Sequence, residues 1–169
     1  MARSCSPATA GFSGSTVIKN GTLQIGDGGT TGSLGGDVQV NSSRTFSINR
    51  SNSLTLSQTL SGTGNITQVG SGTTILTGDS SAFAGSTTIN AGTLQIGNGG
   101  TVLTGNSGSF SGSTVIDAGT LQIGDGGTTG NLGGNVLVNA SGTFSANRSN
   151  SLTLSQTVSG TGSFNQIGS

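Results

Sequence analysis

The residues of this chain that could carry acid–base or metal chemistry are few: five aspartates, one cysteine, Cys5, and one lysine, Lys19. The sequence contains no histidine and no glutamate, so histidine-based triads, glutamate pairs and histidine-ligated zinc are excluded. The five carboxylates are Asp27, Asp37, Asp79, Asp117 and Asp125. Aspartate favours turns because its side chain bonds the backbone close by. We therefore interpret these residues as turn-capping groups.

Three glycine-rich segments raise one alternative for these carboxylates. Gly26–Gly29 and Gly124–Gly127 read Gly-Asp-Gly-Gly, and Gly97–Gly100 reads Gly-Asn-Gly-Gly. This is similar to part of the calcium-binding nonapeptide, but that motif needs tandem copies every nine residues. The segments also lack the Gly-Lys-Ser/Thr of a phosphate-binding loop. We therefore predict no catalytic, cofactor-binding or metal-binding residue, and no cofactor.

The other side chains also argue against several classes of partner. Charged residues make up 6% of the 169 residues and the formal net charge is zero, with the cations scattered at Arg3, Lys19, Arg44, Arg50 and Arg148. Without a basic patch, nucleic acid and anionic membrane surfaces are not expected partners. No apolar run is long enough for a membrane-spanning helix, and we expect none. The sequence has no Trp or Tyr, and its six Phe recur at equivalent repeat positions, which indicates core packing.

The chain is organised around a segment that occurs three times. It runs Ser15–Gly26, Ser86–Gly97 and Ser113–Gly124, and each copy ends in Gly-Thr-Leu-Gln-Ile-Gly. The intervals between the first positions of the copies are 71 and 27. Their sum, 98, is a longer repeat, in which residues 12–71 match 110–169 at 47 of 60 positions. We expect the interval of 27 to be one structural unit and the interval of 71 to be about three units of roughly 24 residues.

Alternating apolar residues predict short strands between turns that contain Gly, Asn, Asp or Ser. The expected strands are Thr22–Ile25, Asp37–Asn41, Thr45–Ile48, Ser53–Ser57, Asn65–Val69 and Thr74–Leu76. Comparison of the copies separates the two faces of a strand. The position of Ile18, Ile89 and Ile116 is always Ile and is predicted to point inward. The position before it tolerates both Val and Thr and is predicted to face solvent.

Strands this short bury a core only when they stack. We therefore predict an all-β fold, a right-handed single-stranded parallel β-helix of six to seven rungs, over residues 12–169. Residues 1–11 are polar and aperiodic, and we expect a tail or the remnant of an interrupted repeat.

The central copy resembles the autotransporter-associated β-strand repeat, also called the passenger-associated transport repeat. The resemblance rests on Leu76-Thr77-Gly78, an aromatic residue at Phe83, and Thr87-Thr88-Ile89-Asn90-Ala91-Gly92-Thr93-Leu94 before a closing glycine. Leu103-Thr104-Gly105-Asn106 through Gly124 matches the pattern again. The family often has Tyr where this chain has Phe83 and Phe110.

The resemblance implies a passenger region of a bacterial type V secreted protein, displayed on the outer membrane or released. It also implies a partner, a C-terminal outer-membrane β-barrel domain in the full-length protein. Ala8-Thr9-Ala10 is similar to a signal cleavage site, but no apolar stretch precedes it. We expect an internal piece of such a protein, or a chain truncated at both ends.

The favoured function is therefore a structural stalk that spaces or displays other domains of an exported surface protein, with no enzymatic activity. The first alternative is an adhesin module, whose polar faces bind a ligand on host or neighbouring cells. A remote alternative is a β-helix polysaccharide lyase, which would need several carboxylates in one groove. An exposed apolar patch that interrupts the outward polar side chains would favour adhesion.

Overall fold

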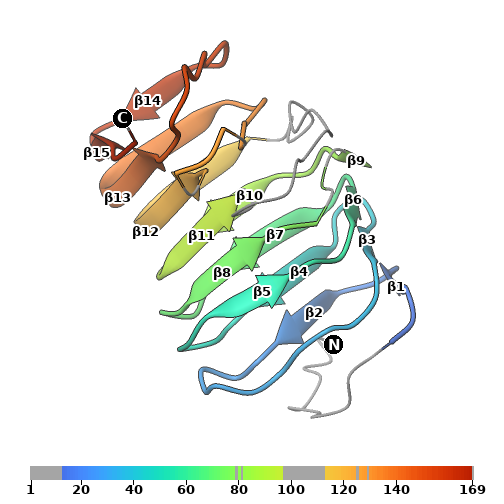
Figure 1. Ribbon diagram of the computed structural model, residues 1–169. Helices are drawn as coiled ribbons and strands as arrows, with labels where there is room; N and C mark the ends of the chain where they lie inside the picture. The colour runs from blue at the N-terminus through green and yellow to red at the C-terminus, as the bar shows by residue number, and fades with distance from the viewer. Residues whose placement is uncertain are drawn as a thin grey trace.

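The computed structural model describes residues 13–78, 80, 82–96, 113–124, 126–128 and 130–168, and all regular structure in these ranges is β. The chain coils so that strands stack in parallel, from β1 and β2 at one end to β14 and β15 at the other (Figure 1). The strands are β1 Thr16–Ile18, β2 Thr22–Ile25, β3 Val38–Val40, β4 Thr45–Ile48, β5 Leu54–Leu56, β6 Leu60–Gly62, β7 Asn65–Gln68, β8 Thr73–Leu76, β9 Ala82–Phe83, β10 Thr87–Ile89, β11 Thr93–Ile96, β12 Thr114–Ile123, β13 Val136–Ala146, β14 Val158–Gly160 and β15 Ser163–Gln166. The predicted all-β, rung-stacked fold is confirmed, as are the strands predicted up to Leu76, to within one residue at each end.

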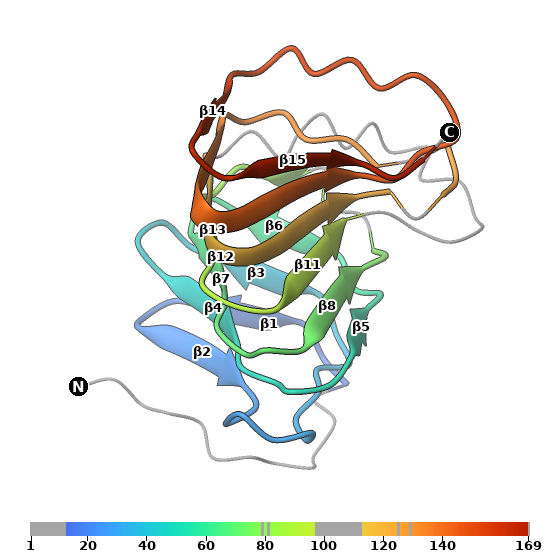
Figure 2. The same ribbon diagram turned by 90° about the vertical axis from the view of Figure 1, so that its left-hand side faces the viewer.

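The strands form three faces. Face A contains β1, β3, β6 and β9. Face B runs β2, β4, β7, β10, the first part of β12, the first part of β13, and β14. Face C runs β5, β8, β11, the second part of β12, the second part of β13, and β15. β12 and β13 are thus continuous strands that bend from face B into face C, as Figure 2 shows.

The register gives the number of turns. On face B the partners run Leu23, Phe46, Ile66, Thr87, Thr114, Val136 and Val158, which makes six steps and therefore about six turns. The sequence number rises by between 20 and 23 at each step, except from Thr87 to Thr114, where it rises by 27. The interval of 27 is therefore one turn, as predicted.

The interval of 71 is not a whole number of turns, and this prediction was wrong. Thr87 is the repeat counterpart of Thr16, but Thr16 lies on face A and Thr87 on face B, above Leu23. The same holds for the interval of 98, because Thr114 also lies on face B. Each later copy is therefore displaced by one face around the axis. The reason is that the chain returns to face A three times after β1, at β3, β6 and β9, and then runs on to β10 on face B, which makes three turns and a third.

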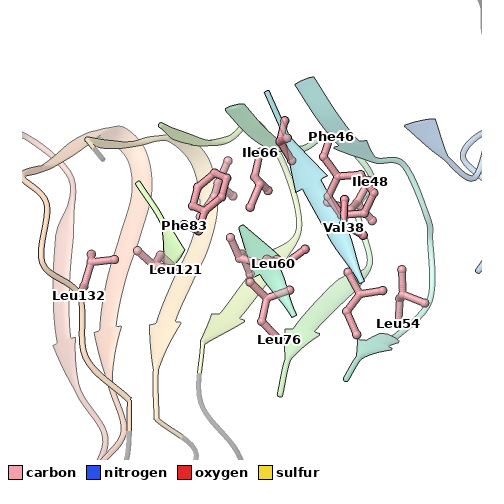
Figure 3. Close-up of a cluster of buried hydrophobic side chains, with 14 of the residues drawn as sticks. Val38, Phe46, Ile48, Leu54, Leu60, Ile66, Leu76, Phe83, Leu121 and Leu132 are labelled. Carbon is pink, nitrogen blue, oxygen red and sulfur yellow. The ribbon is translucent and has the colours of Figure 1, made fainter. Parts of the chain in front are cut away.

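The core is one continuous cluster of Leu, Ile, Val and Phe side chains between the three faces (Figure 3). Phe46, Phe83 and Phe144 are completely buried, which confirms core packing for these three. Each such side chain stabilises the fold by about 1.5–3 kcal/mol. Phe164 is the exception, 57% exposed on the last strand. Phe12 and Phe110 lie outside the described residues.

The predicted inward and outward positions agree with the burial. Ile18, Ile89 and Ile116 are buried, and Val17, one residue earlier, is 44% exposed. Leu94 is completely buried beside the half-buried Gln95. The side chain of Ile96, also predicted to point inward, lies outside the described part.

Candidate functional site

The three described aspartates each accept a hydrogen bond from a different group, and they do not form one cluster. Asp27 Oδ1 accepts the N–H of Gly29 at 3.1 Å, within its own turn. Asp37 Oδ1 accepts the N–H of Thr59 at 2.9 Å, one turn along the solenoid. Asp117 Oδ1 accepts Asn139 Nδ2 at 2.7 Å. The turn-capping interpretation is confirmed for Asp27, which satisfies the glycine N–H that its loop leaves free.

No metal-binding group of three or more Cys, Asp or other ligand side chains exists in the part of the chain that the structure describes. Asp79, Asp125 and the glycine-rich segment 97–100 lie outside the described residues. Asp27, Asp37 and Asp117 lie in a loop after β2, before β3 and inside β12, and each is committed to a different backbone or amide group. The three described carboxylates therefore do not meet in a groove of the kind that a polysaccharide lyase uses.

The most elaborate polar site joins Arg50 to the glycine-rich loop of the preceding turn. The loop runs from residue 26 to 32 after β2, and Arg50 lies two residues after β4. Arg50 Nη2 donates to Thr30 O at 2.6 Å, and Nη1 donates to Gly32 O. Arg50 Nε and Nη2 both donate to Asn52 Oδ1, at 3.0 and 2.8 Å. We call this arrangement the first arginine clamp.

The backbone reinforces the first clamp. Gly28 N donates to Asn49 O at 2.8 Å and Ser51 N donates to Gly29 O at 2.9 Å. Gly28 and Gly32 have φ angles of 98° and 100°, a region that favours glycine because it has no Cβ. The loop can therefore fold back against the next turn and present its carbonyls to the guanidinium.

A second arginine clamp repeats the first at the next copy of the long repeat. Arg148 Nη2 donates to Thr128 O at 2.6 Å, Nη1 donates to Gly130 O, and Nε donates to Asn150 Oδ1 at 3.0 Å. Gly126 N donates to Asn147 O at 2.8 Å. Because of the displacement by one face, the first clamp lies at the corner between faces B and C, and the second lies after face C.

The clamps bind the protein's own backbone. A guanidinium fits such a site because its five N–H donors form a planar fork that can reach several oxygens at once. In both clamps Nε and both Nη atoms already donate to protein oxygens. The site therefore fixes loops and positions turns.

In the sequence Arg50 and Arg148 are recognisable only as scattered cations, and the clamps were not predicted. Their acceptors are backbone carbonyls of the preceding turn, which leave no side-chain signature. One signal was available: both the loop sequence Gly-Asp-Gly-Gly-Thr-Thr-Gly and Asn-Arg-Ser-Asn occur unchanged in the two copies.

Glutamine side chains close the turns in a second recurrent arrangement. Gln24, Gln122 and Gln166 each donate through Nε2 to the carbonyl of the glycine two residues later, at 2.8 to 3.0 Å. Gln68 donates in the same way to Gly70 O at 2.8 Å, but its side chain lies inside the core. There it also accepts the hydroxyl of Thr74 at 2.6 Å, so that its buried amide is paired on both sides.

No helix in the described ranges is both long and apolar enough to cross a membrane.

A search of curated proteins and a search of solved structures each found no match. The family model described as passenger-associated-transport-repeat matches residues 8–25, 66–96 and 96–123. The match confirms the resemblance on which the sequence analysis relied, and these are the segments that supply β1, β2 and β7 to β12. Three segments of the chain, together 76 of its 169 residues, therefore match the passenger-associated-transport-repeat.

Proposed function

We propose that the chain is a stalk segment of an exported bacterial surface protein, which holds other domains away from the outer membrane. In the full-length protein its partner is a C-terminal outer-membrane β-barrel domain. The observation that carries the proposal is the unbroken register from Leu23 to Val158, which stacks a single core through six turns.

The physical argument concerns length and stiffness. Each turn of a stacked sheet adds about 4.8 Å, so six turns give about 29 Å of rod. Every turn contacts the next through backbone hydrogen bonds and apolar side chains, as in other solenoids. A folded rod keeps its ends apart, whereas a flexible chain does not. The arginine clamps support this role because they tie the glycine-rich loops after β2 and β12 to the following turn.

The experiment that tests the proposal is surface display. The 169-residue chain is placed between an outer-membrane anchor and a fluorescent reporter domain, and the height of the reporter above the membrane is measured. We expect about 29 Å of added height, and twice that value for two chains in tandem. The matched control is Ile66→Asp, which puts a charge at a completely buried position and should destroy the rod. Equal heights for the chain and this control would refute the stalk function.

One observation favours the adhesin alternative. On face B the row of register partners is polar from Gln24 to Thr88, but it continues with Val115 and Leu137, which are register partners. Leu137 is 41% exposed. If this apolar pair binds host or neighbouring cells, cells that display the chain will adhere, and Leu137→Ser will abolish adhesion without changing the reporter height. Under the stalk proposal, adhesion stays at the level of the anchor alone.

A further inference from the structure

The bend between β1 and β2 contains an asparagine followed by a glycine. Asn20 and Gly21 lie between Ile18, the last residue of β1, and Thr22, the first residue of β2, and Asn20 is exposed. In a pair of this kind the backbone nitrogen of the glycine can attack Cγ of the asparagine side chain, because glycine has no Cβ that would hinder the approach. The reaction needs a backbone nitrogen that no acceptor holds and a side chain that can rotate toward it.

Both groups are free at this bend. Among the described residues, Gly21 N donates to no acceptor and the side chain of Asn20 has no hydrogen-bond partner. The bend is fixed instead through a carbonyl, since Gly21 O accepts the N–H of Thr45 on the next turn at 3.3 Å. The nucleophile and the group that it attacks are therefore both available without any change in the strand pairing.

The free nitrogen is a property of this corner of the repeat. Gly92 is the counterpart of Gly21 in the second copy, and the φ angle is 66° at both. Gly92 has a turn on each side, because its carbonyl accepts Thr120 N of the following turn and the next residue, Thr93, donates to the preceding turn. Its own N–H nevertheless donates to no acceptor among the described residues. Ala91 precedes this glycine, so that of these two copies only the first supplies a side-chain amide.

A second pair in the same turn shows how the fold can prevent the same reaction. Asp27 precedes Gly28, and an aspartate can close the same ring with loss of water. Gly28 N, however, donates to Asn49 O at 2.8 Å, and Asp27 Oδ1 accepts the N–H of Gly29 at 3.1 Å. Both reacting groups are held in hydrogen bonds that must open before the ring can close. The two chemically similar pairs therefore differ in whether their reacting groups are free.

We propose that Asn20 is a site of spontaneous deamidation in the folded chain, with water as the only co-reactant. Gly21 N bonds to Cγ of Asn20 while the C–N bond of the side-chain amide breaks, and the side-chain nitrogen leaves as ammonia with the proton of Gly21 N. The product is a cyclic succinimide, which water then opens at one of two bonds. Cleavage between Cγ and the ring nitrogen gives aspartate, and cleavage between the main-chain carbonyl carbon and the ring nitrogen gives isoaspartate. This inference does not depend on the proposed function.

The fold can accommodate either product. Each adds one negative charge to a chain whose formal net charge is zero. The new carboxylate lies next to Lys19, whose carbonyl accepts Arg44 Nε at 2.8 Å. Isoaspartate also lengthens the backbone by one carbon, but it does so in the bend before Thr22 and not within a strand. The pairing of β2 with β4 therefore remains possible after the reaction.

The test compares the chain in mildly alkaline buffer with the same chain unfolded in urea, and circular dichroism checks both states. Trypsin cleaves after Lys19 and Arg44 and releases residues 20–44, in which fragmentation locates the mass change from amide to acid at Asn20. The other Asn-Gly pair, Asn98-Gly99, falls in a different tryptic peptide. We expect the rate at Asn20 in the folded chain to lie within about tenfold of the unfolded rate, because no hydrogen bond has to open. Isoaspartate formation at Asp27 should be slowed by folding by more than about tenfold, because two hydrogen bonds must open.

The matched variant is Ala91→Asn, which places the same pair at an internal corner. Ala91 is half-buried and Gly92 N is free, so the new asparagine should deamidate in the folded chain as Asn20 does. The melting temperature checks that the variant remains folded. The proposal would be overturned by a folded-state rate at Asn20 more than about tenfold below the unfolded rate. An asparagine at position 91 that stays intact in the folded variant, or an Asp27 that reacts as fast folded as unfolded, would also overturn it.

Discussion

Thr74 donates a hydrogen bond of 2.6 Å to Gln68 Oε1 inside the apolar core, and both side chains are 1% exposed. Two other threonines in the core, Thr87 and Thr114, are equally buried and their hydroxyl oxygens have no partner among the described residues. Burying an unpaired hydroxyl costs free energy, whereas a paired one contributes about 1 kcal/mol. Loss of the hydroxyl is therefore expected to lower the free energy of unfolding at Thr74 and to raise it at Thr87 and Thr114.

Replacement of threonine by valine tests this difference, because valine keeps the shape and removes the hydroxyl. Thr87→Val and Thr114→Val should each raise the free energy of unfolding by about 1 kcal/mol, since an unpaired polar group is removed. Thr74→Val should lower it by about 1–3 kcal/mol because Gln68 Oε1 loses its donor. Urea unfolding curves measure all three changes. The same sign at Thr74 and Thr87 would contradict the hydrogen-bond assignment.

The two faces of a single strand should differ strongly in their tolerance of charge. Leu94 is completely buried and Gln95, its neighbour in β11, is half-buried. We expect Leu94→Asp to unfold at least the turns around it, because a buried unpaired carboxylate costs several kcal/mol. Gln95→Asp should change the midpoint of thermal unfolding only slightly. If the two variants lost equal stability, the inward face of β11 would be misassigned.

The arginine clamps should depend on the shape of the guanidinium. Arg50→Lys retains the positive charge, but a single ammonium cannot reach Thr30 O, Gly32 O and Asn52 Oδ1 together. We therefore expect Arg50→Lys and Arg50→Ala to speed amide exchange at Gly28 and Ser51 to a similar extent. Arg148→Lys serves as the matched variant in the second clamp. Protection that survived in Arg50→Lys would show that charge, and not shape, holds the loop.

Gly62 is expected to tolerate no side chain. Gly62 ends β6 with a φ of 103°, and a Cβ there would overlap Val40 O on the neighbouring turn. Gly62→Ala should therefore destabilise the chain by more than about 2 kcal/mol, since both strain and steric overlap act against it. Gly14, around which a Cβ would meet nothing within 4 Å, is the control, and Gly14→Ala should be nearly neutral in thermal unfolding.

The sequence predicted the local structure well because strand alternation is a local property. Ile18, Ile89 and Ile116 could be assigned to the core by comparing copies, and all three are buried. The displacement by one face could not be predicted in this way. Identity between copies shows that they fold alike, but the position of a copy around the axis depends on how many faces the intervening chain crosses. Between the first two copies, that number is set by the chain from Gly26 to Ser86.

The arginine clamps illustrate a second limit. The chain brings Arg50 to Thr30 and Gly32 only because residues 26–32 fold against the next turn. Backbone acceptors are present at every residue, so no residue type marks these two as partners. In contrast, the cap formed by Asp27 lies within its own turn, two residues from its donor, and its residue type predicted it.

The central claim is that the chain forms a stack of single turns. In this stack Val115 lies in the same row of register partners as Gln24, and Val17 lies on another face. Distances between spin labels test both statements. In a Cys5→Ser background, one label is placed at Gln24 and the second at Val115, Leu137 or Ser159, which lie four, five and six register steps away. At about 4.8 Å per step we expect about 19, 24 and 29 Å between backbone positions. The same series measured from Val17 should be longer at every site, because Val17 lies on another face. Distances that do not grow stepwise would contradict the stack, and a shorter series from Val17 would contradict the displacement by one face.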